Sequence, residues 1–275
     1  MDNYAILLLV GFFVGTLGTL IGAGGGFLLV PLLIITHPGL TPEIITAISI
    51  AIVGANAISG SIAYSSLKRI DYKAGLLFAA FTIPGSIIGV YTTQYIPKTL
   101  FSIFFGVLLI LLATLLFIKK AASSVPSAVL INQKKLTTHE LTDKEGITYQ
   151  YSYNPYIGIF ISIIVGYLSP VLGIGGGIIH VPALVNWLRF PVVIATATSH
   201  FILAIMATVS VVVHIVNGNY NDPHVLHMVI GLSIGVIAGA QLGAHLSHKI
   251  HGNIIIRALA LCLGLVGLRI LFTSF

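Results

Sequence analysis

The stretch Gly22-Ala-Gly24-Gly25-Gly26-Phe-Leu-Leu-Val30-Pro31 decides the fold, because a near copy of it occurs in the second half of the chain. The copy is Gly173-Ile-Gly175-Gly176-Gly177-Ile-Ile-His180-Val181-Pro182, and it lies 173 − 22 = 151 positions later. Weaker similarities continue at nearly the same offset, as in Thr46-Ala-x-Ser49 against Thr196-Ala-x-Ser199. A chance match of this length is improbable. We therefore predict two related repeats, over residues 1–118 and 155–275.

Long apolar runs surround both glycine clusters. The 275 residues are 57% hydrophobic and only 7% charged, with a mean hydropathy of +1.05, whereas soluble domains carry about 25% charged residues. The runs approach the ~20 residues that a helix needs to cross ~30 Å of hydrocarbon, and they do not alternate as barrel strands do. We predict an all-α polytopic membrane protein whose repeats each hold about five helical segments. These are expected near 4–21, 26–36, 42–66, 74–95 and 98–118, and near 155–172, 177–188, 191–216, 224–247 and 252–273.

The positive charges favour one arrangement of the repeats. If the first two segments of each repeat both cross, or form a hairpin that returns to its starting side, the repeats are inverted. In that case 11 of the 13 Lys and Arg residues fall on one side and only Lys98 and Arg269 on the other. Parallel repeats would give a 9 to 4 split of the same residues. Because Lys and Arg are enriched in cytoplasmic loops, we expect inverted repeats with the N-terminus outside. Whether the short second segments cross or return as hairpins stays open.

Residues 119–154 are polar and differ in composition from the rest of the chain. They include Lys119, Lys120, Lys134 and Lys135, and an alternating stretch, Thr148–Tyr153, that suits a short strand. We interpret this segment as a cytoplasmic linker between the repeats, with a regulatory site as the alternative.

The glycine clusters predict breaks in the membrane helices. A nucleotide-binding fingerprint would need a preceding strand and a βαβ unit. The sequence around the glycine clusters predicts membrane helices instead. Each glycine weakens a helix by ~1 kcal/mol relative to alanine, although glycines also serve for close helix packing. A break frees N–H groups at the start of the next helix, and these groups favour an anion. The candidate anion cradles are Gly24, Gly25 and Gly26 in the first repeat and Gly175, Gly176 and Gly177 in the second.

Polar side chains in the apolar segments complete the candidate site. The substrate-binding candidates are Ser49, Asn56, Thr198, Ser199, His200 and Gln241. Ionisable residues in membrane spans are costly and mark functional positions, and histidine titrates near neutral pH. The candidates for proton coupling are therefore His180, His200, His214 and Glu43. Packing, or capping of a helix in the case of Glu43, is the alternative role for each.

The doubled G-x-G-G-G-x-x-x-x-P motif at Gly22–Pro31 and Gly173–Pro182 resembles the paired signature of the TauE/SafE sulfite exporter family, also called the toluene sulfonate uptake permease family. Ala195-Thr-Ala-Thr198-Ser199 and the spacing of Gly239 and Gly243 are similar too. The resemblance implies a permease of the prokaryotic cytoplasmic membrane for sulfite, sulfonates or related sulfur-containing anions. It also implies that the two glycine clusters and Ser199 face the substrate. This chain departs from an even duplication at His180 and His200, where the first repeat has Leu29 and Ile50.

We therefore expect a secondary transporter working by alternating access, coupled to protons through the residues named above, and not an enzyme. The expected partners are a small sulfur-containing anion and the lipid bilayer, with no nucleic acid, cofactor or metal; the single cysteine, Cys262, offers no thiolate site. A passive anion channel is the alternative. A haem-binding redox protein is a second one, since His200 and His214 are 14 residues apart on one segment. The oligomeric state is left open.

Overall fold

The computed structural model describes residues 3–118, 136–247 and 263–272, and the backbone alone for residues 115–118. Helices dominate the described residues, as the sequence predicts. Those of the first repeat are α1 (Tyr4–Ile21), α2 (Gly26–Thr36), α3 (Pro42–Ser66), α4 (Tyr72–Thr93) and α5 (Lys98–Ile118). Those of the second are α6 (Pro155–Leu172), α7 (Gly177–Asn186), α8 (Val192–Val216) and α9 (Pro223–Leu246). The last predicted segment is described only as the helix Leu263–Phe272.

Polar residues begin most of the long helices. A side-chain oxygen of the residue before the helix accepts a backbone N–H of the first turn at Asn3, Thr41, Asp71, Asn154 and Asp222. Such caps satisfy N–H groups that have no partner inside the helix. The sequence places them at the ends of apolar runs, which is why the predicted boundaries differ from the observed ones by two residues at most.

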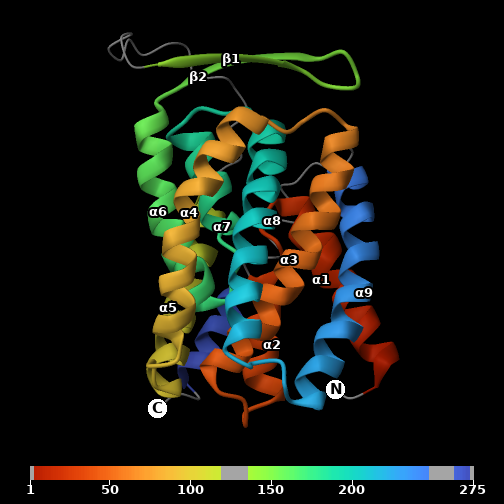
Figure 1. The fold of residues 1–275 in the computed structure, drawn as a ribbon, viewed down its shortest axis with the longest axis vertical. Helices are drawn as coiled ribbons and strands as arrows, with labels where there is room; N and C mark the ends of the chain where they lie inside the picture. Colours follow the sequence, from red (N-terminus) through yellow and green to blue (C-terminus); the bar gives the residue numbers. More distant parts are fainter. Residues whose placement is uncertain (1–2, 119–135, 248–262, 273–275) are drawn as a thin grey trace.

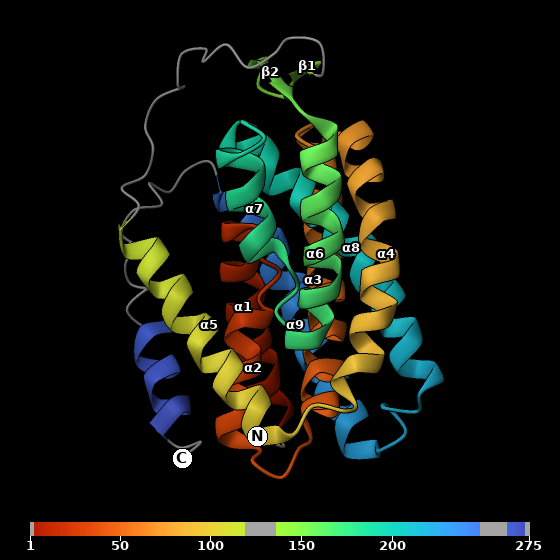
Figure 2. The same ribbon diagram turned by 90° about the vertical axis from the view of Figure 1, so that its left-hand side faces the viewer.

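Six helices of the described residues are long and apolar enough to cross a membrane: α1, α3, α4, α6, α8 and α9. The chain is therefore a multi-pass membrane protein. Helices α2 and α7 have 11 and 10 residues, which gives them a length of about 15–17 Å at 1.5 Å per residue. Each is too short to cross. Figure 2 shows α7 in the half of the bundle near the strands and α2 in the opposite half.

Helices α3 and α8 form the centre of the bundle, where they pack against each other (Figure 1). Helix α9 packs against α3, and helix α4 packs against α8. The outer helices pair across the two halves of the sequence, α1 with α9 and α4 with α6. Helix α5 lies at the side of the bundle against Leu263–Phe272 (Figure 2), where a Cβ on Gly106 would lie 2.8 Å from Leu271 Cγ.

Glycines set the close packing of the outer pairs. Gly235, Gly239 and Gly243 recur every four residues along α9, and a Cβ on each would strike a backbone carbonyl of α1. In the same way, a Cβ on Gly89 of α4 would lie 2.6 Å from the carbonyl oxygen of Tyr167 in α6. Small residues let membrane helices approach until their backbones touch. Gly85 and Gly89 of α4 thus have the same packing role as Gly239 and Gly243 of α9.

A β-hairpin lies across one end of the bundle (Figure 1). Strand β1 (Thr137–Thr142) pairs antiparallel with β2 (Thr148–Tyr153), with Thr137 opposite Tyr153 and Thr142 opposite Thr148. The sequence predicts the second strand but not its partner. The other linker residues, 119–135, lie outside the described residues.

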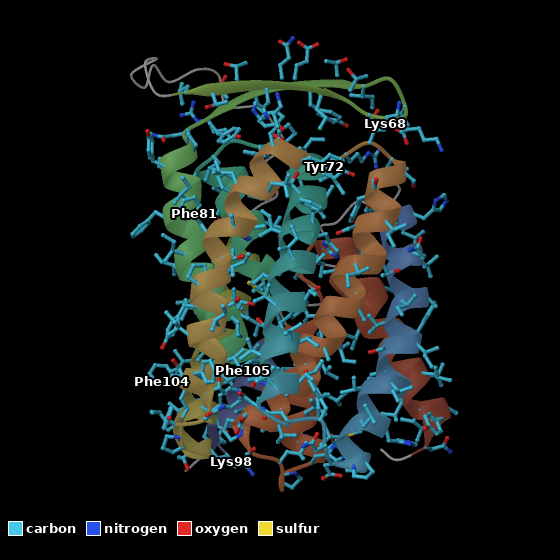
Figure 3. All side chains as sticks on the ribbon, viewed as in Figure 1. Lys68, Tyr72, Phe81, Lys98, Phe104 and Phe105 are labelled. Carbon is cyan, nitrogen blue, oxygen red and sulfur yellow. The ribbon has the colours of Figure 1, made fainter. Side chains whose placement is uncertain are left out.

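Positive residues gather at the end of the bundle that carries the hairpin. Figure 3 shows Lys68 and Tyr72 at this end and Lys98 at the opposite end. Arg69 forms an ion pair with Asp143 of the hairpin, and the backbone N–H of Lys144 donates to Leu67 O. Six of the predicted positive residues lie outside the described part of the chain: Lys119, Lys120, Lys134, Lys135, Lys249 and Arg257.

Candidate functional site

Each glycine cluster breaks a helix because its backbone lies in the left-handed region. The φ angles are +83° at Gly22, +77° at Gly24 and +86° at Gly25. The second break repeats them, with +67° at Gly173, +78° at Gly175 and +62° at Gly176. A residue with a side chain loses about 1–2 kcal/mol in this conformation. The conformation of each break therefore requires its glycines.

The breaks leave the first turns of α2 and α7 without side-chain caps. The residues before these helices are Gly25 and Gly176, which have no side chain to accept a hydrogen bond. In the described residues, the N–H groups of Gly25, Gly26 and Phe27 also have no backbone acceptor. Free N–H groups together with the positive end of a helix dipole form a site that favours an anion.

The two breaks lie against each other inside the bundle. A Cβ on Gly26 would collide with the carbonyl oxygen of Gly173, and a Cβ on Gly177 would collide with that of Gly22. The third glycine of each cluster therefore allows the backbone of one half to touch the backbone of the other. The structure thus brings together the two glycine clusters that the sequence singles out.

Ser49 and Ser199 join each central helix to the break of the other half. The hydroxyl of Ser49 in α3 donates to Gly173 O at 2.5 Å, and the hydroxyl of Ser199 in α8 donates to Gly22 O at 3.5 Å. Both serines are fully buried. Because their hydroxyl protons are directed at backbone carbonyls, these serines position the breaks in this conformation.

Two apolar side chains fill the space between the breaks. A Cβ on Gly175 would lie 2.6 Å from Val53 Cγ1, and a Cβ on Gly24 would lie 3.0 Å from the same methyl and 3.6 Å from Leu203 Cδ1. Val53 and Leu203 are fully buried and stand 203 − 53 = 150 positions apart, so they occupy matching places in the two halves. The centre of the bundle is closed in this conformation.

A buried polar cluster lies beside the first break. The hydroxyl of Thr19 donates to Asn56 Oδ1 at 2.7 Å, and Tyr64 OH donates to Thr19 O at 3.0 Å. The ring of His200 meets that of Tyr64 edge-on, with centroids 5.5 Å apart, and lies over Gly60. Asn56 and His200 have no exposed surface. Asn56 Nδ2 and both ring nitrogens of His200 lack a hydrogen-bond partner in the described residues.

Two proton-coupling candidates meet at the end of the bundle opposite the hairpin. The Asn219 amide nitrogen lies 2.8 Å from Glu43 Oε1 and 2.9 Å from His214 Nδ1. Asn219 belongs to the loop between α8 and α9, and this loop also reaches α3 through a bond from Tyr220 OH to Ala47 O. The loop therefore connects an acid at the start of α3 with a buried histidine near the end of α8.

The remaining candidates have partners elsewhere in the bundle. Thr198 Oγ1 accepts the backbone N–H of Asp71 at 3.0 Å, and Gln241 donates from Nε2 to Ser59 O at 2.9 Å. His180 Nε2 lies 3.3 Å from Ser162 Oγ, within the pair formed by α6 and α7. In this conformation Thr198 and Gln241 join helices and loops at positions outside the two breaks.

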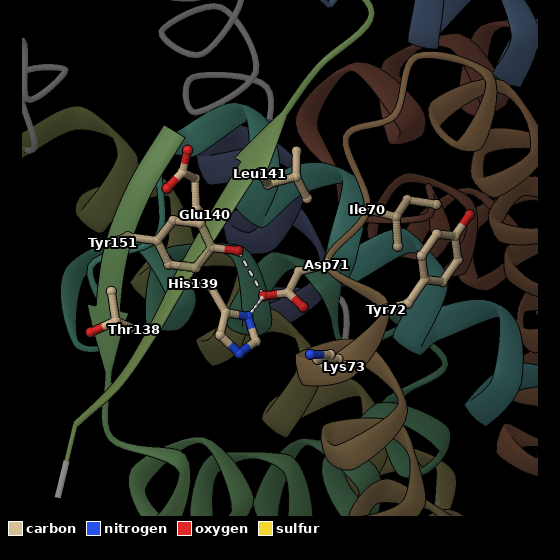
Figure 4. A pocket seen from close by; sticks show the side chains of 9 residues that line it. All are labelled: Ile70, Asp71, Tyr72, Lys73, Thr138, His139, Glu140, Leu141 and Tyr151. Atoms are coloured by element: carbon tan, nitrogen blue, oxygen red, sulfur yellow. Dashed lines mark hydrogen bonds and ion pairs between the residues drawn. The ribbon is translucent and has the colours of Figure 1, made fainter. Parts of the chain in front are cut away.

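A polar cluster under the hairpin was not singled out from the sequence. Figure 4 shows Asp71 between the two strands and α4, where its Oδ2 lies 2.6 Å from His139 Nδ1 and accepts Tyr151 OH at 2.7 Å. The same Asp71 presents its backbone N–H to Thr198 of α8. The signal in the sequence is the run Arg69-Ile-Asp71 at the start of α4 together with the alternating aromatic residues of β2.

Charges and burial shift the acidities of the hairpin groups. Burial raises the pKa of Asp143, but bonds from the Ile147 N–H and the Arg69 guanidinium outweigh it, so the pKa lies below its usual value. Burial, with Asp71 nearby, raises the pKa of Tyr151 far above its usual range and that of Tyr153 to about 12. Tyr151 therefore stays protonated and donates to Asp71, while Asp143 stays ionised opposite Arg69.

Interrupted helices that meet inside a multi-pass bundle are characteristic of membrane transport proteins, in which broken helices form the substrate site. The fold and the paired breaks define this class. The comparison with known families identifies it further: the chain belongs to the family described as Sulfite exporter TauE/SafE, which matches residues 7–270.

Several curated proteins are similar to nearly the whole chain. The probable membrane transporter protein YunE of Bacillus subtilis is 32% identical over 276 residues, covering 98% of each chain. A probable membrane transporter protein of Methanocaldococcus jannaschii is 27% identical over 97% of this chain and 94% of its own. YdhB of Bacillus subtilis, also a probable membrane transporter protein, is 26% identical over 97% of this chain and 100% of its own. No solved structure matches the chain.

Proposed function

We propose that this protein is a secondary transporter for a small sulfur-containing anion and works by alternating access at the paired glycine breaks. One observation carries the proposal: two short helices start inside the bundle from breaks that touch each other, and their first N–H groups lack side-chain caps. Such helix starts favour an anion. The choice of a sulfur-containing anion as the substrate rests on the description of the family as sulfite exporters.

The packing supports two related repeats, over residues 1–118 and 155–275, and the positions of α2 and α7 in opposite halves of the bundle support their inversion (Figure 2). Helix α1 packs against α9, and its counterpart α6 packs against α4, so exchanging the two halves exchanges the two contacts. The contact of α3 with α9 and that of α8 with α4 are related in the same way. Two such halves can rock against each other about the central helices and open the site to either side.

The positive residues support an orientation with the hairpin in the cytoplasm. Lys68, Arg69 and Lys144 lie at this end, while Lys98 lies at the other. Cytoplasmic loops are enriched in Lys and Arg. Residues 119–154 would then form a cytoplasmic linker, and the group Glu43, Asn219 and His214 would face the outside.

Counterflow in proteoliposomes tests the function. Vesicles loaded with unlabelled sulfite should accumulate ³⁵S-sulfite above its outside concentration for a time, and Gly25→Leu or Gly176→Leu should abolish this accumulation. Gly54→Ala is the matched control, because its new Cβ would meet Ala207 Cβ at an ordinary 3.5 Å. Loading the vesicles with sulfate, thiosulfate, sulfoacetate, taurine or chloride in place of unlabelled sulfite ranks these compounds by how well each drives the accumulation of label.

A passive anion channel is the alternative, and the same vesicles separate the two. A channel lets label equilibrate but cannot concentrate it against its own gradient. Equilibration without accumulation would therefore refute alternating access. The buried side chains of Val53 and Leu203 beside the breaks favour a carrier, because an open pore would leave this position unfilled.

A further inference from the structure

The polar groups beside the two breaks differ, although the breaks themselves are alike. At the first break the buried groups without hydrogen-bond partners are Asn56 Nδ2 and the ring nitrogens of His200. At an offset of 150, the places of these two residues in the other half are held by Met206 and Ile50. The unpartnered group beside the second break is Ser169 Oγ, which would lie 3.3 Å from a Cβ on Gly176. The first break therefore has the richer set of donors.

Asn56 is directed at the start of α2. A Cβ on Gly18 would lie 2.5 Å from Gly25 N and 2.8 Å from Asn56 Nδ2, so both nitrogens lie close to Gly18 of α1. Thr19 holds the amide in place by donating to Asn56 Oδ1. The amide oxygen is thus occupied, while the amide nitrogen has no partner in the described residues and lies beside Gly18 together with Gly25 N.

His200 approaches this cluster from α8. A Cβ on Gly60 would lie 2.6 Å from His200 Cδ2, 3.2 Å from its Nε2 and 3.3 Å from Thr19 Cγ2, so the imidazole borders on Thr19 across the glycine. The carbonyl of Thr196, one turn earlier in α8, lies within reach of the ring as an acceptor, which leaves one ring nitrogen for a ligand. Burying polar groups without partners costs about 1–3 kcal/mol each. A protein retains such groups where a ligand supplies the missing partner.

We propose that the first break is an asymmetric binding station in which the Asn56 amide, the His200 imidazole and the Gly25 N–H hold a singly charged oxyanion. The station rests on the proposed function and specifies its substrate. Its donors are neutral or dipolar groups, and each described Lys and Arg lies in a loop or near the end of a helix. The cost of removing an ion from water rises with the square of its charge. A hydrogensulfite or a sulfonate monoanion fits such a station, whereas the sulfate dianion would lose more hydration free energy on entering it.

Ligand-dependent thermal stability of the full-length protein in detergent tests the station, with sulfite as the probe. Asn56→Leu and His200→Phe should each weaken sulfite binding by about 10-fold or more, the usual effect of losing a hydrogen bond to a charged group. Met206→Leu is the matched control, because it introduces the same leucine at the position of the other half that corresponds to Asn56. The Met206→Leu variant should bind sulfite as tightly as the wild type does. His200→Gln, which keeps a donor, should recover part of the affinity. Sulfate should bind the wild type more weakly than sulfite.

The empty variants provide a second readout. Without sulfite, His200→Phe should be at least as stable as the wild type, because it removes buried polar atoms that have no partner. A structural role for His200 would instead lower the stability of the empty protein.

The outcomes separate this inference from the function itself. Wild-type protein that binds sulfite, with Asn56→Leu and His200→Phe binding equally well, would refute the station and leave the transporter standing. Tighter binding of sulfate than of sulfite would refute the singly charged oxyanion. Wild-type protein that is folded and responds saturably to none of these anions would refute both the station and the proposed function.

Discussion

The contact between the two breaks can be tested by adding one methyl group at a time. Gly26→Ala places a Cβ against the carbonyl oxygen of Gly173, and Gly177→Ala places one against that of Gly22. Both obstacles are backbone atoms, which cannot rotate away as a side chain can. The breaks must therefore separate, and overpacking of this kind costs about 1–3 kcal/mol.

This cost corresponds to a measurable shift in thermal stability. A chain of this size loses about 2–4 °C of Tm for each kcal/mol, so each variant should unfold roughly 2–12 °C below the wild type. Gly54→Ala is the control: its Cβ meets Ala207 Cβ at 3.5 Å, and alanine favours a helix by up to about 1 kcal/mol over glycine. The control should therefore unfold at or above the wild-type temperature.

Size-exclusion chromatography after heating, with the protein detected by a fluorescent fusion, measures these apparent Tm values in detergent. Counterflow of labelled sulfite should fall in Gly26→Ala and Gly177→Ala and persist in Gly54→Ala. If all three variants unfold at the same temperature, the backbones of the two breaks do not touch as described. Because the two methyl groups would act on one interface, the double variant should lose less than the sum of the single losses.

Three further predictions concern other parts of the molecule. Asp143→Ala should weaken docking of the hairpin by about 1–3 kcal/mol, seen as faster hydrogen exchange in residues 137–153. In the wild type the same bonds are present above the usual pKa of an aspartate and are lost as the pH falls through the lowered pKa of Asp143. The protection of these amides, measured against the intrinsic exchange rate at each pH, should therefore fall only in acid. Glu43→Gln should lower sulfite accumulation driven by a pH gradient while counterflow persists, and equal losses in both assays would exclude a coupling role. Gly239→Val should prevent α9 from reaching α1 and reduce the yield of folded protein, whereas Ala238→Val, on the exposed side of α9, should not.

The boundaries of the helices follow from local features of the sequence. Apolar runs of suitable length, with residues such as Asn3, Thr41 and Asn154 before them, determine where helices begin. The glycine breaks are local as well, since successive glycines weaken a helix whatever surrounds them. The apolar runs and the glycine breaks were predicted because each depends on neighbours along the chain.

The partners of polar side chains depend on contacts between distant segments and were predicted less well. Ser199, a predicted substrate-binding residue, lies beside the first break and donates to Gly22 O. Thr198 is its neighbour in sequence, but one residue turns a helix by about 100°, and Thr198 bonds Asp71 of another loop. The docking of the hairpin on Arg69 and Asp71 was missed for the same reason, because 74 positions separate Arg69 from Asp143.

The exchange of outer helices between the halves also bears on how the protein is made. Helix α1 is synthesised first, yet the helix against which it packs, α9, is the last of the long spanning helices described to leave the ribosome. During most of translation, the face of α1 that packs against the glycines of α9 therefore has no partner helix in the bilayer. In the described residues, each half of the sequence contributes an outer helix that packs against the other half, α1 on α9 and α6 on α4. These outer contacts can therefore be completed only after α9 has been synthesised.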